Sequence, residues 1–431
     1  MISLDEALAA YPRHVHALEA ETIPLTHALH RVLRSPARAR CDLPRFSQSA
    51  MDGYAVTLED AARVLRTLTI TDAVAAGDTK ILRPLKPGEC QRILTGARLP
   101  PNTGAVVAQE RVSVDGGQVQ LSESSMPRAN IRWQGEELRA GAAVGEAGQR
   151  LTPGLIASLA SAGVAQVEVS RAPRIAVLVS GDELRPLGAP LAEGQIWDSN
   201  GPLVTSWLQA RGYAASQSHL SDSRAAVETV LNDALSNNDL VITTGGVSVG
   251  DKDFIIPAAE ALGVKRAFWR VAQKPGKPIY FGLWPSPPAP LPQAGEGRTT
   301  SSLSRSRERV ADGRERARVS ALLGLPGNPG AVLVGMTLHA RAILDLLEGA
   351  EPAGAAFHFG SLAATVKADA QRERLVRMRL ETDAQGRNLL HPLPHQDSHM
   401  LSNMSSATVL ARLPARELDY ATGETVRWTA L

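Results

Sequence analysis

Apolar residues recur at different spacings along this chain, and each spacing predicts a different kind of element. Near the start, Leu4, Ala7 and Tyr11 lie three and four residues apart, which is the spacing of one helix face. Ser3 and Glu6 supply the S-x-x-E form of a capping box at the same place. We therefore expect the chain to open with a helix.

Other stretches have a shorter period. Residues 46–137 alternate apolar and polar positions in short segments separated by turn residues, which predicts a β-rich module. Residues 351–431 alternate again, in LVRMRL, TVLARL and TVRWTA, and predict a small β-barrel or sandwich. Residues 1–45 and 138–172 flank the β-rich module, and we expect them to form a linking domain with a small-residue helix that begins near Pro153.

Between residues 173 and 350, short apolar strands alternate with helices. Ile175–Ser180, Leu240–Thr244 and residues 321–325 are rich in Val, Ile and Leu, as strands buried on both faces of a sheet are. Repeated β–α units predict a parallel, doubly wound sheet with helices on both faces. The chain as a whole is thus expected to be multidomain, α/β plus β, with a three-layer α/β domain.

This pattern breaks at residues 285–319, where Pro, Ser and Arg dominate and no buried period remains. Such composition predicts a disordered insertion. Residues 285–318 hold seven arginines against four acids, so the basic excess of the chain lies there. An arginine run can bind nucleic acid, but this one has no interleaved aromatic residues for stacking, which favours a solvated loop.

The totals exclude several classes of protein. A chain of 431 residues with 44% hydrophobic and 21% charged residues is globular and long enough for several domains. Its formal net charge of +2 gives no general reason to expect nucleic acid or an anionic membrane as partner. No stretch reaches the ~18 apolar residues of a membrane helix. Cys41 and Cys90 cannot build a disulfide framework, which fits a reducing, cytoplasmic location.

Candidate chemistry gathers where the predicted strands end. In an open parallel sheet, ligands bind beyond the carboxyl ends of the strands. Each loop there has a reading as ordinary turn or capping chemistry, but four such loops at one edge favour a binding site. The four are Ser180-Gly181-Asp182-Glu183, Asp198-Ser199-Asn200, Gly245-Gly246-Val247-Ser248 and Pro326-Gly327-Asn328-Pro329.

The loop after Leu240–Thr244 raises a particular question, because its glycines run into two carboxylates. Gly245 and Gly246 let a ligand approach the main chain, and a helix start beyond them attracts anions. Asp251 and Asp253 would repel a phosphate unless a cation lay between them. The loop therefore suggests a phosphate and a metal ion together; the alternative is a tight turn with either aspartate as N-cap. It matches neither nucleotide-binding glycine fingerprint, which disfavours a P-loop kinase or a dehydrogenase.

Two further stretches carry charged or hydroxyl groups at turns. Lys274 and Lys277 flank a proline-stiffened turn in QKPGKP, which suits a small oxyanion, although two unpartnered surface lysines are the alternative. In the β-rich module, Asp52 precedes Gly53, and Thr95 lies at a turn. The ten histidines form no metal-binding pair of the HExxH kind.

Taken together, these motifs resemble one known family. In order, they are SAMDGYAV, RILTGARLP, NIRWQGEEL, SGDEL, GQIWDSN, TTGGVSVGDKD, KPGKP, LPGNP and HQDSH. The set is similar to the molybdopterin molybdenumtransferases, which include the C-terminal domain of gephyrin. The resemblance covers nearly the whole chain outside the insertion.

This resemblance implies an enzyme that inserts molybdenum from molybdate into adenylylated molybdopterin and releases AMP, with Mg²⁺ or a similar divalent cation. It implies a homodimer that dimerises through the linking domain, with its cleft between the α/β domain of one subunit and the β-rich module of the other. It also implies a C-terminal β-barrel and transient contact with molybdopterin adenylyltransferase and apo molybdoenzymes. Neither nucleic acid nor a membrane is expected as partner.

The resemblance also assigns roles to residues. The glycine loop, Gly245, Gly246 and Ser248, would accept the pterin and pyrophosphate, and Glu183 with Asp253 would hold the metal. Molybdate would be received by Lys274, Lys277, Arg377 and Ser398. The remaining substrate contacts would come from Asp52, Thr95, Arg132 and Glu137 of the β-rich module and from Asp198, Ser199, Asn200, Asp222, Pro326 and Pro329 of the α/β domain.

Three positions depart from the family pattern. Glu137 stands where Asp is usual, Ala331 where a serine is common, and Asp397 where a glycine is usual. Asp397 puts a negative charge beside the expected molybdate receptor. Two other functions therefore stay open: a molybdopterin adenylyltransferase, which would need the α/β domain alone, and a non-catalytic scaffold of the same fold.

Overall fold

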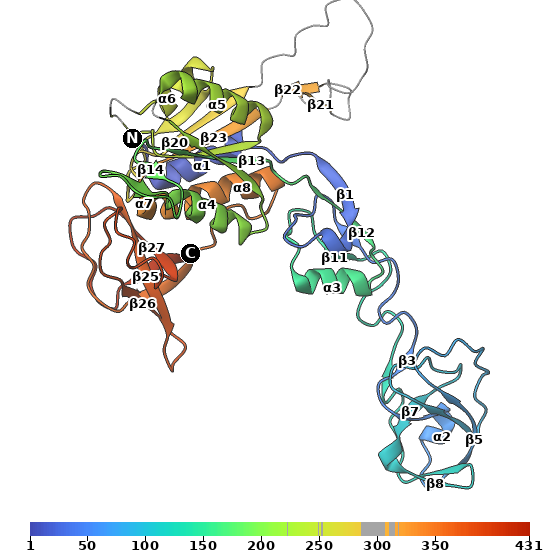
Figure 1. The fold of residues 1–431 in the computed structure, drawn as a ribbon. Coiled ribbons are helices and arrows are strands. Elements are labelled where there is room, and N and C mark those ends of the chain that lie inside the picture. The colour runs from blue at the N-terminus through green and yellow to red at the C-terminus, as the bar shows by residue number, and fades with distance from the viewer. Residues whose placement is uncertain (222, 249, 251–252, 286–306, 310–314, 318) are drawn as a thin grey trace, which may run out of the picture.

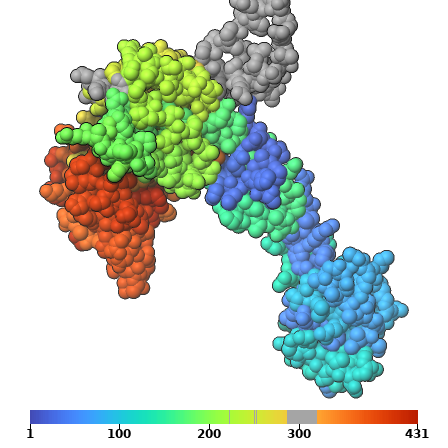
Figure 2. Space-filling view, viewed as in Figure 1, coloured from blue at the N-terminus to red at the C-terminus, as the bar shows by residue number. Residues whose placement is uncertain are grey.

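Three bodies lie in a row in the computed structural model, which describes residues 1–431 except 222, 249, 251–252, 286–306, 310–314 and 318. At one end, the α/β domain and the C-terminal barrel lie against each other (Figure 1). The linking domain follows, and the β-rich module lies at the opposite end. The space-filling view in Figure 2 shows the same row, with a narrow waist between the last two bodies.

The α/β domain is built on a six-stranded sheet. Its strands, in spatial order, are β16 (Ala215–Leu220), β13 (Ile175–Ser180), β17 (Leu240–Thr244), β23 (Val319–Leu325), β20 (Tyr280–Pro285) and β18 (Lys265–Trp269). The first four are parallel, as predicted. β20 runs antiparallel to both of its neighbours, so the prediction of a wholly parallel sheet is wrong there. β20 and β23 flank the insertion and pair with each other, and antiparallel neighbours can be joined without the crossover that parallel strands need.

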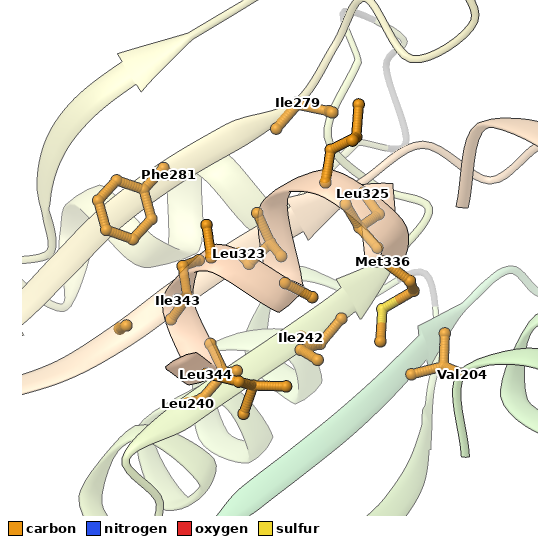
Figure 3. Close-up of a cluster of buried hydrophobic side chains, with 14 of the residues drawn as sticks. Val204, Leu240, Ile242, Ile279, Phe281, Leu323, Leu325, Met336, Ile343 and Leu344 are labelled. Atoms are coloured by element: carbon orange, nitrogen blue, oxygen red, sulfur yellow. The ribbon is translucent and has the colours of Figure 1, made fainter. Parts of the chain in front are cut away.

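Helices cover both faces of this sheet, which makes the three predicted layers. One face is covered by α5 (Arg224–Asn237) and α6 (Ile255–Ala261). The other face is covered by α1 (Leu4–His14), α4 (Asn200–Gln209), α7 (Pro329–Gly335) and α8 (Arg341–Glu348). In Figure 3, Met336, Ile343 and Leu344 of the last helical stretch pack over Ile242 and Leu323 of the sheet. Burial of such side chains is the main stabilising term of a fold of this kind.

The first helix belongs to this core. Ser3 and Glu6 form the predicted capping box, in which each side chain bonds the other's backbone N–H. Leu4, Ala7 and Tyr11 are buried in the α/β domain. The linking domain as observed therefore begins after α1 rather than at residue 1, because the apolar face of α1 packs against the sheet.

A continuous helical stretch, Pro329–Glu348, joins α7 and α8 through a π-helical turn, Met336–Ala340. Among the described residues it is the one helix long and apolar enough to cross a membrane, but 89% of its apolar window is buried inside the protein. It is the core helix of the α/β domain.

The linking domain consists of two short antiparallel pairs and a helix. β1 (Ala20–Pro24) pairs with β12 (Gln166–Ser170), and β2 (Ala37–Arg38) pairs with β11 (Ala143–Gly145). The predicted small-residue helix is α3 (Pro153–Ser161), capped by Thr152, and a single turn lies at Leu25–His27.

The β-rich module has its own six-stranded sheet and core. In spatial order the strands are β7 (Ala105–Ala108), β4 (Gly53–Val56), β6 (Glu89–Ile93), β5 (Thr67–Val74), β9 (Gln118–Leu121) and β8 (Val112–Asp115). A short pair, β3 (Gln48–Ser49) with β10 (Ile131–Arg132), lies where the module joins the linking domain. The helix α2 (Leu58–Ala61) and the turn Gln109–Arg111 complete it.

The C-terminal domain is the expected barrel. Its strands follow the order β25 (Glu373–Thr382), β26 (Asn388–Pro392), β24 (His358–Leu362), β28 (Thr425–Ala430) and β27 (Val409–Leu413), and β27 closes onto β25. β19 (Gln273–Lys274), from the α/β domain, pairs in parallel with the start of β25. This pairing ties the predicted oxyanion turn to the barrel.

Two strand pairs remain. β14 (Leu184–Arg185) and β15 (Ile196–Trp197) form a parallel pair beside the sheet. Within the predicted insertion, β21 (Arg307–Arg309) and β22 (Glu315–Ala317) pair as an antiparallel hairpin. The rest of residues 286–318 lies outside the described residues, and so does the prediction of disorder made for it.

Candidate active site

Three of the predicted loops meet at the carboxyl edge of the α/β sheet. In the strand register, Thr244 lies between Val179 and Leu325, so the loops after β13, β17 and β23 start side by side. Gly245 has a φ of +86°, and a Cβ there would lie 2.8 Å from the carbonyl oxygen of Ser180. The backbone N–H of Gly245 donates to Leu325 (3.0 Å). Only glycine fits this close approach without strain.

The start of α4 joins this edge from the side. Asn200 donates from Nδ2 to the carbonyl oxygen of Gly327 in the loop after β23 (2.6 Å). Asp198 accepts from the N–H of Gly201 (2.9 Å) and from Gln217 (3.2 Å), so its carboxylate is engaged in holding the helix start. Ser199 is the N-cap residue but makes no side-chain cap bond.

The predicted metal-binding acids lie in loops at this edge. Glu183 is exposed just after β13. Asp253 is half-buried and accepts from the N–H of Gly250 (2.7 Å); it does not cap α6, whose N-cap position is Phe254. Asp222 and Asp251 lie outside the described residues. Among the residues that are described, no group of three or more His, Cys, Asp or Glu side chains is placed to hold a metal ion.

A cavity of about 340 Å³ opens where the α/β domain meets the barrel. Lys274 and Lys277 line it from the turn after β19, and Ser398 lines it from the barrel. The two lysines are exposed. The complete lining is Gln273, Lys274, Pro275, Gly276, Lys277, Pro278, Pro326, Asn328, Ala331, Arg372, Gln396, Asp397, Ser398 and His399. Two ammonium groups and a hydroxyl around one small cavity form a receptor for an oxyanion.

Ser398 is held against the loop after β23. Its Oγ accepts from Nδ2 of Asn328 (2.8 Å), and its carbonyl oxygen accepts from the N–H of Gly330 (2.8 Å). A Cβ at Gly330 would lie 2.4 Å from Nη1 of Arg377 and 2.8 Å from that carbonyl oxygen. The helix start at Pro329 and the barrel loop therefore fit together because residue 330 has no side chain.

Arg377 was predicted to receive molybdate, but its position does not fit that role. Only 2% of it is exposed, and it does not line the cavity. Its Nη2 donates to the carbonyl oxygens of His395 (3.0 Å) and Asp397 (3.2 Å), so the guanidinium lies behind the loop that carries Ser398. Burial lowers its pKa, and the nearby Asp397 carboxylate acts in the opposite direction. Here Arg377 positions the loop, because β25 places its side chain in the interior.

Two polar residues that line the cavity, Arg372 and Asn328, had no role assigned from the sequence. Arg372 lines it and is held by Asp369, to which it donates at 3.0 Å. Asn328 lines it as well. The sequence alone could not single out Arg372, because Arg372, Arg374 and Arg377 lie within six residues of one another. Only the fold shows which of these side chains reaches the cavity.

The unusual residues Ala331 and Asp397 both line this cavity. Ala331 is 2% exposed and supplies no hydroxyl. Asp397 is exposed, and its charge is partly compensated by Arg377 next to it.

The β-rich module carries a second group of predicted residues. Oδ1 of Asp52 accepts from both the N–H (2.7 Å) and the hydroxyl (2.8 Å) of Thr95, and these bonds lower the pKa of Asp52. Arg132 is exposed on β10, and Glu137 is exposed in the following loop. Within one chain, this module lies at the far end of the molecule from the cavity (Figure 1).

Comparison with known proteins matches every domain. Residues 2–163 match the MoeA N-terminal region (domain I and II), residues 176–345 a "probable molybdopterin binding domain", and residues 360–431 the MoeA C-terminal region (domain IV). A molybdopterin molybdenumtransferase of Haemophilus influenzae is 31% identical over 430 residues, which cover 99% of this chain and 98% of that protein. The chain belongs to the molybdopterin molybdenumtransferase family.

Other relatives agree with this membership. The molybdopterin molybdenumtransferase of Nostoc sp. is 32% identical over 77% of this chain and 70% of its own length, and that of Staphylococcus epidermidis is 31% identical over 81% and 77%. The predictions of a transferase and of a part in molybdenum cofactor biosynthesis are thereby confirmed.

Solved structures confirm the fold of this molybdenumtransferase-family chain. The molybdopterin biosynthesis MoeA protein of Pyrococcus horikoshii superposes with a TM-score of 0.78 at 22% identity, over 100% of both chains. A second structure of a MoeA protein from the same organism gives 0.75 at 24% identity, over 100% of this chain and 99% of the other.

Proposed function

We propose that this protein inserts molybdenum from molybdate into adenylylated molybdopterin and releases AMP. The observation that carries the proposal is the cavity in which Lys274, Lys277 and Ser398 converge beside the loop after β23. Molybdate is a tetrahedral dianion, and it would be bound by the two ammonium groups and by hydrogen-bond donors. We assign Arg372 to this site in place of Arg377, because Arg372 lines the cavity and Arg377 lies behind its wall.

The pterin and pyrophosphate would lie along the neighbouring strand ends. The loop of Gly245, Gly246 and Ser248 lies there, with both glycines partly exposed and Ser248 exposed, and Pro326, Pro329 and the start of α4 border the same edge. The two dithiolene thiols of the substrate would displace one oxygen of molybdate, which leaves as water with the two thiol protons, and a water molecule would cleave the phosphoanhydride to give AMP. The protein's part is positioning and charge stabilisation, and no protein nucleophile is required.

The donor set at this edge fits Mg²⁺. Glu183 is exposed, and Asp253 uses one carboxylate oxygen for the N–H of Gly250, so each has an oxygen left for a hard cation. Two carboxylates with substrate phosphates and waters are the usual coordination of Mg²⁺. When bound, the ion supplies charge neutralisation at the phosphoanhydride. Asp222 would contact the same substrate.

The working unit would be a homodimer. The β-rich module lies at the opposite end of the molecule from the α/β domain (Figure 1), and this module carries Asp52, Thr95, Arg132 and Glu137. We propose that the β-rich module of one subunit lies over the α/β domain of the other, with dimerisation through the linking domain. Molybdopterin adenylyltransferase would deliver the substrate, apo molybdoenzymes would take the product, and the location would be the cytoplasm.

The test is a reconstituted reaction. Purified protein with adenylylated molybdopterin, Mg²⁺ and molybdate should release AMP only when molybdate is present, and the product should activate an apo molybdoenzyme. Lys277→Ala should weaken the response to molybdate at least tenfold, because it removes one charge from the cavity. The matched control is Lys86→Ala, another exposed lysine followed by proline, in the β-rich module.

Two results would refute the proposal. Pyrophosphate release from ATP with molybdopterin would identify an adenylyltransferase. A folded dimer that binds adenylylated molybdopterin but does not convert it, whichever divalent metal and oxyanion are supplied, would identify a scaffold.

A further inference from the structure

A line of buried polar side chains runs from the first helix to the wall of the cavity. The hydroxyl of Tyr11 lies 2.8 Å from Nδ1 of His339, and Nε2 of His339 lies 3.0 Å from Oε1 of Gln273. Nε2 of Gln273 donates to the carbonyl oxygen of Pro275 (3.2 Å). None of Tyr11, His339 and Gln273 is solvent-exposed. Buried polar groups are retained when each finds its partner, as these do.

The hydrogen bonds in this line can run in one direction only. The carbonyl oxygen of Pro275 can only accept, so the amide nitrogen of Gln273 donates to it and Oε1 of Gln273 is left as an acceptor. His339 must then donate from Nε2, and its Nδ1 must accept from the Tyr11 hydroxyl. A neutral imidazole has this one donor and one acceptor. Burial lowers the pKa of His339 to about 3, so the ring is neutral near pH 7.

The cavity end of the line supports the lysine turn directly. Gly276 has a φ of +98°, and a Cβ there would lie 2.6 Å from Nε2 of Gln273, so the turn rests on this amide. The turn is closed by the N–H of Val271, which donates to the carbonyl oxygen of Lys277 (2.9 Å). Lys274 and Lys277, at the two ends of this turn, both line the cavity.

His339 reaches Gln273 from an irregular part of its helix. It lies in the π-helical turn Met336–Ala340, and the N–H of Arg341 donates to the carbonyl oxygen of Met336, five residues earlier. Such a turn inserts one extra residue into a helix, and single π turns recur at functional sites. Here it lies within the core helix of the α/β domain, at the residue whose side chain contacts that of Gln273.

We propose that His339 is a positioning residue for the anion cavity: through Gln273 it holds the Lys274–Lys277 turn in the geometry that binds the oxyanion. This inference rests on the proposed function of the cavity. His339 touches neither substrate nor reacting atoms. Its contribution is to fix the Gln273 amide, which in turn fixes the Pro275 carbonyl and the spacing of the two lysines.

The test compares variants that remove the hydrogen bond at Nε2 of His339 with one that removes the hydrogen bond at Nδ1. His339→Leu removes the donor to Gln273, whereas His339→Gln keeps an N–H near the position of Nε2. Tyr11→Phe is the matched control, because it deletes a buried hydrogen bond to the same ring but leaves the bond to Gln273. Two readouts are used: the KM for molybdate against kcat in AMP release, and amide hydrogen exchange of residues 270–281, which needs no substrate.

His339→Leu should raise the KM for molybdate about tenfold with kcat within about twofold, and should speed exchange of residues 270–281. His339→Gln should bring both readouts back to within about twofold of the wild type, and Tyr11→Phe should leave both there. If His339→Leu does not fold, Gln273→Met, which cuts the same line, should give the same two changes.

Either of two results overturns the proposal. One is a folded His339→Leu with unchanged KM and exchange; the other is a Tyr11→Phe that shifts them as far as His339→Leu does. Failure of the proposed function is a separate outcome, because the wild-type protein would then release AMP at a rate that does not depend on molybdate. Amide hydrogen exchange would still test the role of His339 in that case.

Discussion

At the scale of single residues, Thr95 stabilises the charged form of the Asp52 carboxylate. The N–H and the hydroxyl of Thr95 both donate to Oδ1, and they lower the pKa of Asp52 below its ordinary value. A charged carboxylate is the form that would act at a substrate across the dimer.

Thr95→Val should raise the pKa of Asp52 partway to its ordinary value, because the hydroxyl donor is lost and the N–H donor remains. Thr95→Ser should restore the low value. A carboxyl-carbon NMR titration measures both. Asp42 is the internal control: its pKa is lowered by the N–H of Ala140 and the side chain of Gln134, and it should not move. Equal shifts at both aspartates would contradict this account.

His339 makes a prediction for acid stability. Burial, with Arg412 as a smaller cause, lowers its folded-state pKa to about 3, against an ordinary 6.5. Between these two pKa values His339 is protonated in the unfolded chain but neutral in the folded protein. The free energy of unfolding therefore keeps its full value above pH 6.5 and falls as the pH drops toward 3. At pH 4.5 the loss from this one group is about 3 kcal/mol.

His339→Gln does not titrate, so its urea midpoint should fall less than that of the wild type between pH 7 and pH 4.5. The control is His27→Gln, which changes an exposed histidine. Parallel curves for wild type and His339→Gln would show that the ring is not held neutral by its surroundings.

At the scale of elements, the strand ends decide where the site lies. Sequence reasoning placed β13, β17 and β23 and their polar loops, because runs of β-branched residues followed by glycine are local signals. It could not place the loops at a given distance. The closeness of Gly245 to Ser180 follows from the parallel register, which is a property of the sheet.

Gly245→Ala should therefore destabilise the protein more than Gly263→Ala does. Both glycines have positive φ, so both variants incur strain of about 1 kcal/mol. A Cβ at Gly245 also meets the Ser180 carbonyl at 2.8 Å, whereas one at Gly263 meets nothing within 4 Å. The extra loss at Gly245 is about 1–3 kcal/mol, measured from unfolding midpoints. Equal losses would mean that the loop moves freely away from β13.

At the scale of the whole molecule, the two groups of proposed catalytic residues lie at opposite ends of one chain (Figure 1). The proposed two-fold dimer would resolve this separation, because each site could then draw on both chains. Asp52 and Thr95 would then act on the substrate bound at Glu183, Asp253 and Lys277 of the partner.

Complementation tests this arrangement. Asp52→Asn and Glu183→Gln should each be inactive alone, but chains mixed by co-expression should recover roughly a quarter of wild-type activity, since half of the dimers then hold one intact site. Glu183→Gln mixed with Lys277→Ala should show no more activity than its Lys277→Ala chains do alone, because both changes fall on the same domain. Recovery in the second mixture, or none in the first, would place each site within a single chain.

The sequence by itself determined the elements, their order and the types of chemistry. Capping residues, hydrophobic period and glycine or lysine turns act over a few residues, so α1, the strands β13, β17 and β23, a C-terminal barrel or sandwich and the lysine turn could be read from the chain. The tertiary structure alone decided what depends on distance and burial. In the folded protein, β20 runs antiparallel to its neighbours, and α1 is buried in the α/β core. Arg372, not Arg377, lines the cavity. The tertiary structure also joined Tyr11 to His339, 328 residues away, because a buried polar group is satisfied by whichever partner packing brings near it.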